Sequence, residues 1–187
     1  MFIRPFAVVF AAMVGLLGCR GSSAKGPEGF KAGQPSVVEP PVTAESALSH
    51  AAKELVGTWT CRGSVHGPGG ASPSEVTFDI KPDLDKAWLR ADFAVVSGEY
   101  PYKFTAYRTF DAAAGQWGNV IVDNMGGDAR SSSTDGVTWL GTSSGPMGAM
   151  NIRDTERVVS PGVMKMRGQY QMDGQDWSTG YDLDCRK

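Results

Sequence analysis

The stretch Glu75-Val-Thr-Phe-Asp-Ile80 decides the fold class, because apolar and polar residues alternate along it without a break. A β-strand turns successive side chains to opposite faces, so this period of two places Val76, Phe78 and Ile80 together on one face. The opposite face carries Thr77 and Asp79. The pattern predicts a strand with one side in a core and one side in solvent.

The sequence contains nine further short runs of this kind, and turn residues such as Asp135-Gly136 and Pro161-Gly162 separate them. The expected strands are Thr58–Ser64, Glu75–Ile80, Trp88–Val96, Tyr102–Phe110, Trp117–Asp123, Ala129–Ser133, Val137–Ser143, Ala149–Val159, Val163–Met172 and Trp177–Cys185. In the last run we expect Trp177, Thr179, Tyr181, Leu183 and Cys185 on one face. Short strands without intervening helices predict an all-β, antiparallel up-and-down meander, and closure into a single barrel of about ten strands removes its exposed edges.

One short helix is expected before the strands. Leu48, Ala51, Ala52 and Leu55 recur at helical spacing. Thr43 and Ser46 are both suitable N-cap residues, and Gly57 is placed to end the helix.

The N-terminus has the form of a secretory signal, with Arg4 before the apolar run 6–14 and small residues before a cleavage point. A membrane-spanning helix needs ~20 apolar residues, and this run is shorter and is broken by glycine. Leu16-Leu-Gly-Cys19 resembles the lipobox of a bacterial lipoprotein signal peptide. The resemblance implies cleavage before Cys19 and acylation of Cys19 with diacylglycerol and palmitate-type chains. A conventional signal with a coincidental cysteine is the alternative.

This resemblance divides the chain into a signal peptide (1–18), a lipidated cysteine with a flexible tether (19–42), and a helix-plus-barrel domain (43–187). It implies a lipid-anchored protein of the bacterial cell envelope. Arg20, rather than aspartate, follows Cys19, and by resemblance to enteric lipoproteins this favours the outer membrane. Because that sorting rule varies between bacterial groups, the inner membrane stays an alternative.

The composition limits the partners. Removal of residues 1–18 takes away one basic residue, Arg4, and leaves 17 basic and 20 acidic residues. The sequence has no cluster of basic residues of the kind that binds nucleic acid or anionic lipid, so membrane attachment depends on Cys19. Two cysteines remain in an exported chain, and we expect a Cys61–Cys185 disulfide. A metal site is the weaker alternative because these cysteines lack nearby histidines.

Gly57-Thr-Trp59, directly after the short helix, resembles the calycin superfamily of lipocalins and fatty-acid-binding-like barrels. In that superfamily the tryptophan packs across one barrel end beneath a basic residue from the last strand, and Arg186 is the nearest match in sequence. The resemblance implies a calycin-like barrel with Gly57, Trp59 and Arg186 as its barrel-end motif.

A second resemblance, to the DUF1579 type of bacterial proteins, covers roughly residues 48–187. It is carried by Leu55-Val-Gly-Thr-Trp59, Tyr107-Arg-Thr-Phe-Asp111, Thr134-Asp-Gly136 and the segment 173–187. It implies the same barrel and no particular activity. Haem barrels of nitrobindin type use a late histidine, whereas His50 and His66 are both early, so we predict no haem and no other cofactor.

Two patterns suggest chemistry, and the sequence favours simpler explanations for both. Gly141-Thr-Ser143-Ser-Gly145 fits the serine-hydrolase pattern, but no helix follows Ser143 and both histidines precede it, so we predict no catalytic residues. The carboxylates Asp83, Asp85, Asp182 and Asp184 are better explained by turn capping and a solvated strand face than by a metal site. Clustered methionines (125, 147, 150, 164, 166 and 172) can bind Cu(I), but packing is the favoured explanation, and we predict no metal.

The binding hypothesis depends on the residues that are expected to point into the barrel. The expected lining residues of an internal site are Phe78, Phe93, Phe104, Trp139 and Tyr181. Small barrels either fill with side chains or enclose one small ligand. The leading hypothesis is a non-catalytic envelope lipoprotein that binds a small hydrophobic ligand. The alternative is an interaction or structural module with a filled barrel, whose loop 66–73 contacts another envelope protein; a hydrolase ranks third.

Overall fold

The computed structural model describes residues 42–67 and 69–187, so the lipobox and Cys19 lie outside the described residues. All ten expected strands are present, and one helix precedes them in this part of the chain. The elements are α1 (Ala44–Leu55), β1 (Gly57–Gly67), β2 (Gly70–Asp83), β3 (Trp88–Ser97), β4 (Lys103–Asp111), β5 (Gln116–Asp123), β6 (Asp128–Ser133), β7 (Thr138–Gly145), β8 (Gly148–Ser160), β9 (Val163–Gln171) and β10 (Ser178–Arg186).

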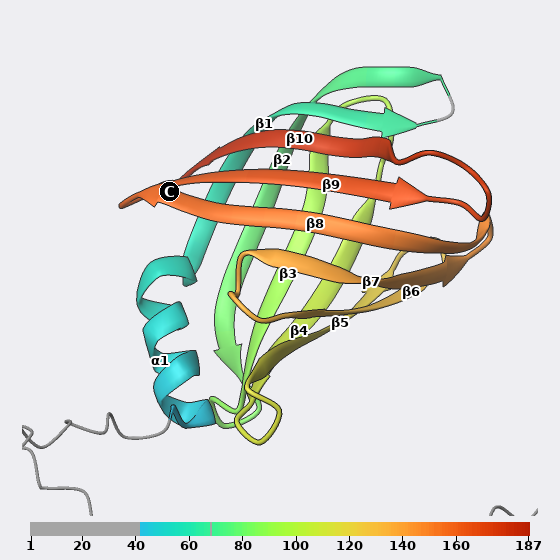
Figure 1. Ribbon diagram of the computed structural model, residues 1–187. Helices are drawn as coiled ribbons and strands as arrows, with labels where there is room; N and C mark the ends of the chain where they lie inside the picture. The colour runs from blue at the N-terminus through green and yellow to red at the C-terminus, as the bar shows by residue number, and fades with distance from the viewer. Residues whose placement is uncertain (1–41, 68) are drawn as a thin grey trace, which may run out of the picture. The chain divides into compact units, whose positions relative to one another are not determined.

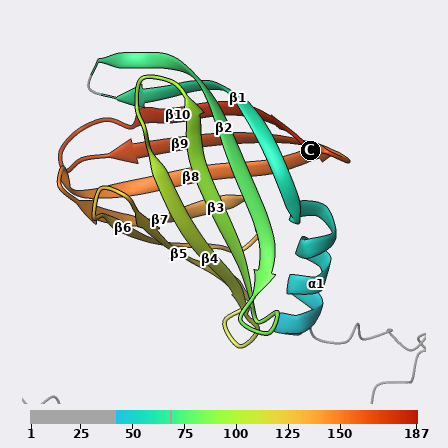
Figure 2. The same ribbon diagram turned by 180° about the vertical axis from the view of Figure 1, so that it is seen from behind.

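The strands form a closed barrel in which every strand is antiparallel to both of its neighbours. Each strand pairs with the next one along the chain, and β1 closes the barrel by pairing with β10 (Figures 1 and 2). Closure leaves none of these ten described strands with an unpaired edge. The predicted all-β, up-and-down barrel of ten strands is therefore confirmed.

Helix α1 begins and ends near the predicted positions. The Thr43 side chain accepts a hydrogen bond from the Ser46 backbone N–H, and the Ser46 side chain accepts one from the Thr43 N–H, which makes a reciprocal capping box. Leu48 is buried, and the helix packs against β2, β3 and β4. Among the described residues, no helix has both the length and the apolarity needed to cross a bilayer. We call the end of the barrel at Gly57 the helix end and the opposite end, at the β1–β2 turn, the far end.

The predicted alternation produces the core. Val76, Phe78 and Ile80 are 0–2% exposed, whereas the outward-facing Asp79 between them is only partly buried. The buried apolar set comes mainly from β1, β2, β3, β9 and β10, where it includes Trp59, Met164 and Met166. Inward positions on β6 carry the shorter residues Ala129, Ser131 and Ser133. The interior is therefore bulky and apolar on one side and short and polar on the other.

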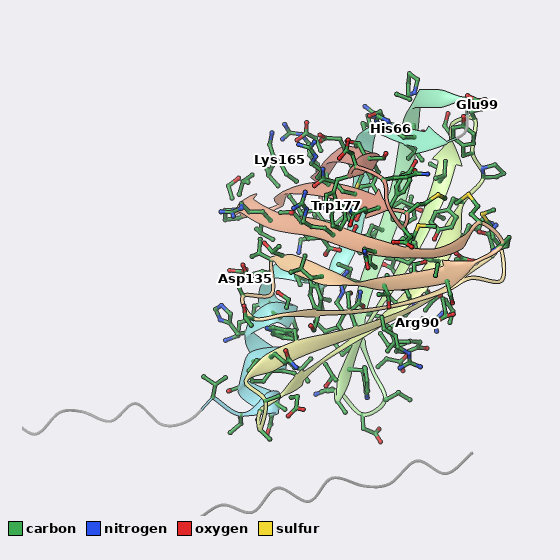
Figure 3. All side chains as sticks on the ribbon, turned by 45° about the vertical axis from the view of Figure 1, so that its right-hand side comes forward. His66, Arg90, Glu99, Asp135, Lys165 and Trp177 are labelled. Carbon is green, nitrogen blue, oxygen red and sulfur yellow. A yellow bond between two sulfur atoms is a disulfide. The ribbon has the colours of Figure 1, made fainter. Side chains whose placement is uncertain are left out.

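The expectation that Trp177 and Thr179 share a face with Tyr181 is wrong. The register of β10 against β9 shifts between Thr179 and Tyr181, so one additional residue, Gly180, interrupts the alternation. A bulge of one residue reverses the facing of everything beyond it. Trp177 lies on the outside of the wall (Figure 3), where its ring is 4.6 Å from the guanidinium carbon of Arg153.

Candidate functional site

The five residues expected to line an internal site all point into the barrel. Phe78, Phe93 and Trp139 are 0–4% exposed, and Phe104 and Tyr181 are partly buried. The Phe93 and Phe104 rings stack with their centroids 4.6 Å apart, and Phe78 and Tyr181 pack against Phe93 at 6.0 and 6.4 Å. Four of the five thus form one aromatic cluster. Trp139 lies with a polar group instead.

That polar group is centred on an ion pair across the interior. Arg108 of β4 donates two hydrogen bonds of 2.6 Å to the two carboxylate oxygens of Glu156 on β8. Both side chains are at most 7% exposed, and the guanidinium carbon lies 4.9 Å from the centre of the Trp139 ring. Burial lowers the pKa of Arg108, but the charge and hydrogen bonds of Glu156 more than offset this and leave that pKa raised. Arg108 therefore stays charged, and Glu156 neutralises it.

A second carboxylate, Asp154, lies on the same inward face two residues before Glu156. The Tyr181 hydroxyl donates a 3.0 Å hydrogen bond to it from β10. Gly168 on β9 is the residue opposite both Asp154 and Tyr181. A side chain at Gly168 would collide with the Tyr181 ring, whose Cδ1 would be 2.6 Å from the added Cβ. Glycine at this position therefore lets the tyrosine lie across β9 and reach Asp154.

The environment of Asp154 is unusual for a carboxylate. Burial, reinforced by the charge of Glu156, raises the pKa of Asp154 to about 7, although the Tyr181 hydrogen bond and Arg108 act in the opposite direction. Burial likewise raises the pKa of Tyr181 well above its ordinary value. Yet both residues keep part of their surface accessible. Side chains that are deep in the molecule and still accessible are those expected along the lumen of a barrel.

The inward faces of the ten described strands hold three acids and one base. The base, Arg108, forms an ion pair with Glu156. Asp123 accepts hydrogen bonds from the backbone N–H groups of Met125 and Gly127 and from the Tyr102 hydroxyl, so the β5–β6 turn satisfies it. Among the described residues Asp154 forms no ion pair. Its only hydrogen-bonding side-chain partner among them is Tyr181.

Three buried polar atoms have no hydrogen-bond partner among the described residues: Arg108 Nε, Asn119 Oδ1 and Trp139 Nε1. Asn119 lies directly opposite Arg108 across β4 and β5, and Trp139 lies directly opposite Asp154 across β7 and β8. All three residues are at most 5% exposed. The polar side of the interior therefore has unused hydrogen-bonding capacity next to Asp154.

Of the residues expected to form a barrel-end motif, Trp59 has a basic side chain over its ring, but that side chain is not Arg186. Trp59 is fully buried, and its indole N–H donates to the Leu55 carbonyl. The basic side chain over its ring belongs to Lys187, with Nζ 4.7 Å from the ring centre, and not to Arg186. Cys185 faces inward, so strand alternation turns Arg186 outward and returns position 187 to the inner side.

Lys187 also explains the glycine of the motif. Its ammonium group donates 2.9 Å hydrogen bonds to the carbonyls of Glu54 and Val56, at the C-terminal end of α1. Gly57 has φ +129°, and a Cβ there would lie 2.8 Å from Lys187 Cδ. Only glycine allows both this backbone conformation and the close approach of the lysine.

The predicted disulfide is confirmed. Cys61 and Cys185 are directly opposite each other in the β1–β10 pair and are bonded, and neither is exposed. The bond joins the first and last strands at the point where the barrel closes.

The serine-hydrolase pattern does not assemble. Ser143 lies within β7 opposite Met150, whereas His66 lies on β1 and its ring is 3.3 Å from the Ser64 hydroxyl. Within residues 42–67 and 69–187, no group of three or more His, Cys, Asp or Glu residues is placed to hold a metal. Asp83 accepts a hydrogen bond from the Leu84 N–H in the β2–β3 turn, as expected of a turn residue.

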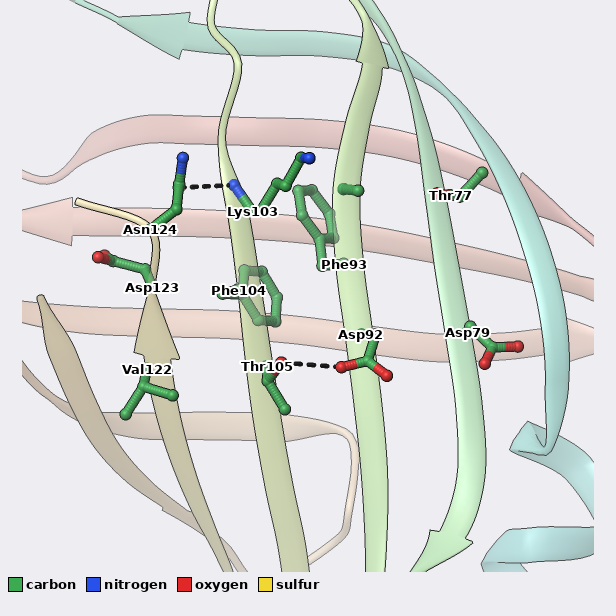
Figure 4. A pocket seen from close by; sticks show the side chains of 11 residues that line it. Thr77, Asp79, Asp92, Phe93, Lys103, Phe104, Thr105, Val122, Asp123 and Asn124 are labelled. Atoms are coloured by element: carbon green, nitrogen blue, oxygen red, sulfur yellow. Dashed lines mark hydrogen bonds between the residues drawn. The ribbon is translucent and has the colours of Figure 1, made fainter. Parts of the chain in front are cut away.

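Two open hollows of the described surface lie on the outer wall. The larger, of about 480 Å³, is open and crosses β2 to β5 (Figure 4). Its outward-facing lining includes Asp79, Asp92 and Thr105, and the Thr105 hydroxyl donates a 2.8 Å hydrogen bond to Asp92. Lys81 and Arg90 also lie within ion-pair distance of Asp92. Neighbouring side chains of the same face therefore satisfy the Asp92 carboxylate.

Sequence reasoning missed Arg108, Glu156 and Asp154, although a signal was present. Arg108 shares its strand face with Phe104 and Ala106, and the two acids share theirs with Ile152. A charge on a face that is otherwise apolar points into the core. The sequence could therefore have placed these three charges inside the barrel, although not which of them pair.

No protein-family model matches this chain, and no curated protein is significantly similar to it. The fold therefore defines the class by itself: a closed, ten-stranded antiparallel β-barrel, consistent with a calycin-like fold.

Proposed function

We propose that this protein is a lipid-anchored envelope lipoprotein of the calycin-like, DUF1579 type, and that its barrel binds a small, mainly apolar ligand in the far half of the interior. The observation that carries the binding proposal is a gradient of accessibility along the barrel. At the helix end, Trp59 and Met164 are fully buried. Toward the far end, Tyr102 and Tyr181 point inward and remain partly accessible.

The gradient supports a short ligand with a mainly apolar body. The filled helix end excludes a long ligand, because the packed side chains there leave no room for one. The far half offers the stacked rings of Phe93 and Phe104 and the aliphatic side chain of Ile121. Ligand sites of this kind gain affinity from apolar contact and orientation from a few polar groups.

Two neighbouring substitutions on β5 test the binding site. Ile121 faces the interior, whereas the next residue, Val122, is 53% exposed on the outer wall. We expect Ile121→Trp to fill the far half and abolish binding of the neutral apolar dye N-phenyl-1-naphthylamine, with Val122→Trp unchanged. The assay is dye fluorescence with the full chain carrying Cys19→Ser. Equal binding by both variants would exclude the interior as the site.

The anchor rests on sequence, because Cys19 lies outside the described residues. Two or three acyl chains hold a protein stably on a bilayer, whereas one chain binds only marginally. We expect Cys19→Ser to move the protein from the membrane pellet to the soluble envelope fraction. A Cys19→Ser protein that stays in the pellet would mean that the anchor is wrong.

A filled barrel acting as an interaction module is the second candidate, and a different observation favours it. Met125 and Met147 are 53% and 59% exposed on neighbouring turns at the far end. Exposed methionines adapt to varied apolar partners. Loss of envelope crosslinks in Met125→Ser/Met147→Ser, with dye binding unchanged, would support this function.

A further inference from the structure

The charges inside the barrel do not balance, and the imbalance is concentrated at one residue. Arg108 is the only base among the inward positions of the ten described strands, and Glu156 binds it with both oxygens. Asp123 is satisfied by its own turn. Asp154 is left deep in the interior with a single hydrogen bond from Tyr181. A buried carboxylate normally has an opposite charge beside it.

The groups around Asp154 suit a cation better than an anion. Trp139 lies directly across the strand pair from it, and Tyr181 contacts it and packs on Phe93. Aromatic faces attract cations through their quadrupole. An anionic ligand would instead meet Asp154 and Glu156, and the one guanidinium nearby is already neutralised. The lumen thus disfavours a carboxylate and favours an ammonium group.

The unused hydrogen-bonding atoms are a second, independent indication of a ligand at this wall. Trp139 Nε1, Asn119 Oδ1 and Arg108 Nε are buried without partners among the described residues. An unpaired buried polar atom costs ~1–3 kcal/mol, so such atoms are normally satisfied. The N–H groups of Trp139 and Arg108 would be satisfied by an acceptor oxygen on a bound molecule, and Asn119 Oδ1 would be satisfied by a donor such as an ammonium N–H.

We propose that the lumen binds a small protonated amine with an apolar body, whose ammonium group pairs with the Asp154 carboxylate while the body packs on the aromatic cluster. This inference rests on the proposed function, since it names the ligand class of the same interior site. The apolar body would contact Phe93 and Phe104. The ammonium group would donate to the Asp154 oxygen that Tyr181 does not use.

Binding should depend on pH through Asp154. The charged or titratable groups that interact with it are Glu156 on its own strand, Arg108 on β4, Tyr102 just before β4 and Tyr181 on β10. Asp123 on β5 and Tyr170 on β9 lie on inward positions of their strands. Because the pKa of Asp154 is about 7, its ionised fraction falls about tenfold between pH 8 and pH 6. The affinity for an ammonium ligand should fall by the same factor, and the affinity for a neutral ligand should not change.

Three probes of equal length test the proposal: hexylammonium, hexan-1-ol and hexanoate, titrated calorimetrically into the full chain carrying Cys19→Ser. At pH 8 we expect hexylammonium to bind tighter than hexan-1-ol by about tenfold or more, the size of one charge-assisted hydrogen bond. Hexanoate should bind most weakly. Asp154→Asn should remove the preference for the amine, whereas Asp182→Asn, on the outer face of β10, should keep it.

The outcomes separate this inference from the proposed function. If hexan-1-ol or hexanoate binds as tightly as the amine, the amine site is wrong and the apolar site stands. If no probe binds, the proposed function fails as well. The pH series on the unmutated site keeps the test decisive even if Asp154→Asn misfolds, because protonation at pH 6 removes the same charge.

Discussion

The ion pair inside the barrel allows a sharp test of how this core is stabilised. Glu156→Gln keeps the shape of the side chain and removes the charge that neutralises Arg108. Both partners are at most 7% exposed, so solvent cannot compensate the guanidinium that remains. Breaking a buried pair by removing one partner typically costs ~3–5 kcal/mol. We expect Glu156→Gln to lower the free energy of unfolding by this amount.

The double variant Arg108→Met/Glu156→Leu should recover most of that loss. It removes both charges together, and it also removes the unpartnered Arg108 Nε. The replaced side chains would contact the rings of Trp139 and Phe78, which already pack on the guanidinium at 4.9 and 5.9 Å. Replacing a whole buried pair by apolar residues is often neutral, or stabilising by ~1–4 kcal/mol.

Urea unfolding with the disulfide intact measures both effects by linear extrapolation. The control is Asp184→Asn, which breaks a 3.3 Å pair with Lys165 whose side chains are 72% and 67% exposed. Such surface pairs contribute ~0–1 kcal/mol. A Glu156→Gln loss no larger than that of the control, or a double variant as unstable as the single one, would refute the reasoning.

Three further predictions follow from the same geometry. The pKa of Asp154 is raised to about 7 in the folded protein, so the unfolded chain loses the carboxyl proton at a lower pH than the folded protein does. The free energy of unfolding should therefore fall from about pH 4 to pH 7, and urea unfolding of Asp154→Asn should not show this fall. Lys187→Met should lower stability by ~1–2 kcal/mol through loss of the Trp59 contact and the α1 carbonyl bonds, whereas Arg186→Met should change urea unfolding little. Replacing both disulfide cysteines by alanine should cost ~4–5 kcal/mol for a closure of 124 residues, and a free thiol in the native protein would contradict the bond.

The sequence predicted the strands, the helix and the closure well, because each depends on local patterns. Alternation in β2 and in most other strands is uninterrupted, and turn residues mark the ends, so even the inward facing of Phe93 and Phe104 follows. The disulfide followed from the cysteine count in an exported chain. These features need no knowledge of which strands are neighbours.

The errors arose where one residue shifts the phase or where distant strands meet. Gly180 adds a residue to β10 and turns Trp177 outward, which composition alone does not reveal. The expectation that Arg186 covers Trp59 overlooked strand alternation. Because Cys185 faces inward, Arg186 faces outward and Lys187 returns to the inner side. The pairing of Arg108 with Glu156 depends on β4 and β8 facing each other across the lumen, 48 residues apart in sequence. Strand patterns place each residue inward but do not say which partner it meets.

Asp154 gives a physical reason to regard the polar side of this barrel as functional. Above about pH 4 the raised pKa makes the aspartate a source of instability, up to roughly 4 kcal/mol once both states are ionised. An asparagine could still accept the Tyr181 hydrogen bond without that penalty. Stability alone therefore favours replacement of Asp154, and Asp154→Asn should be more stable than the unmodified protein at pH 8. A ligand with a compensating positive charge would turn the same carboxylate from a destabilising group into a source of binding energy.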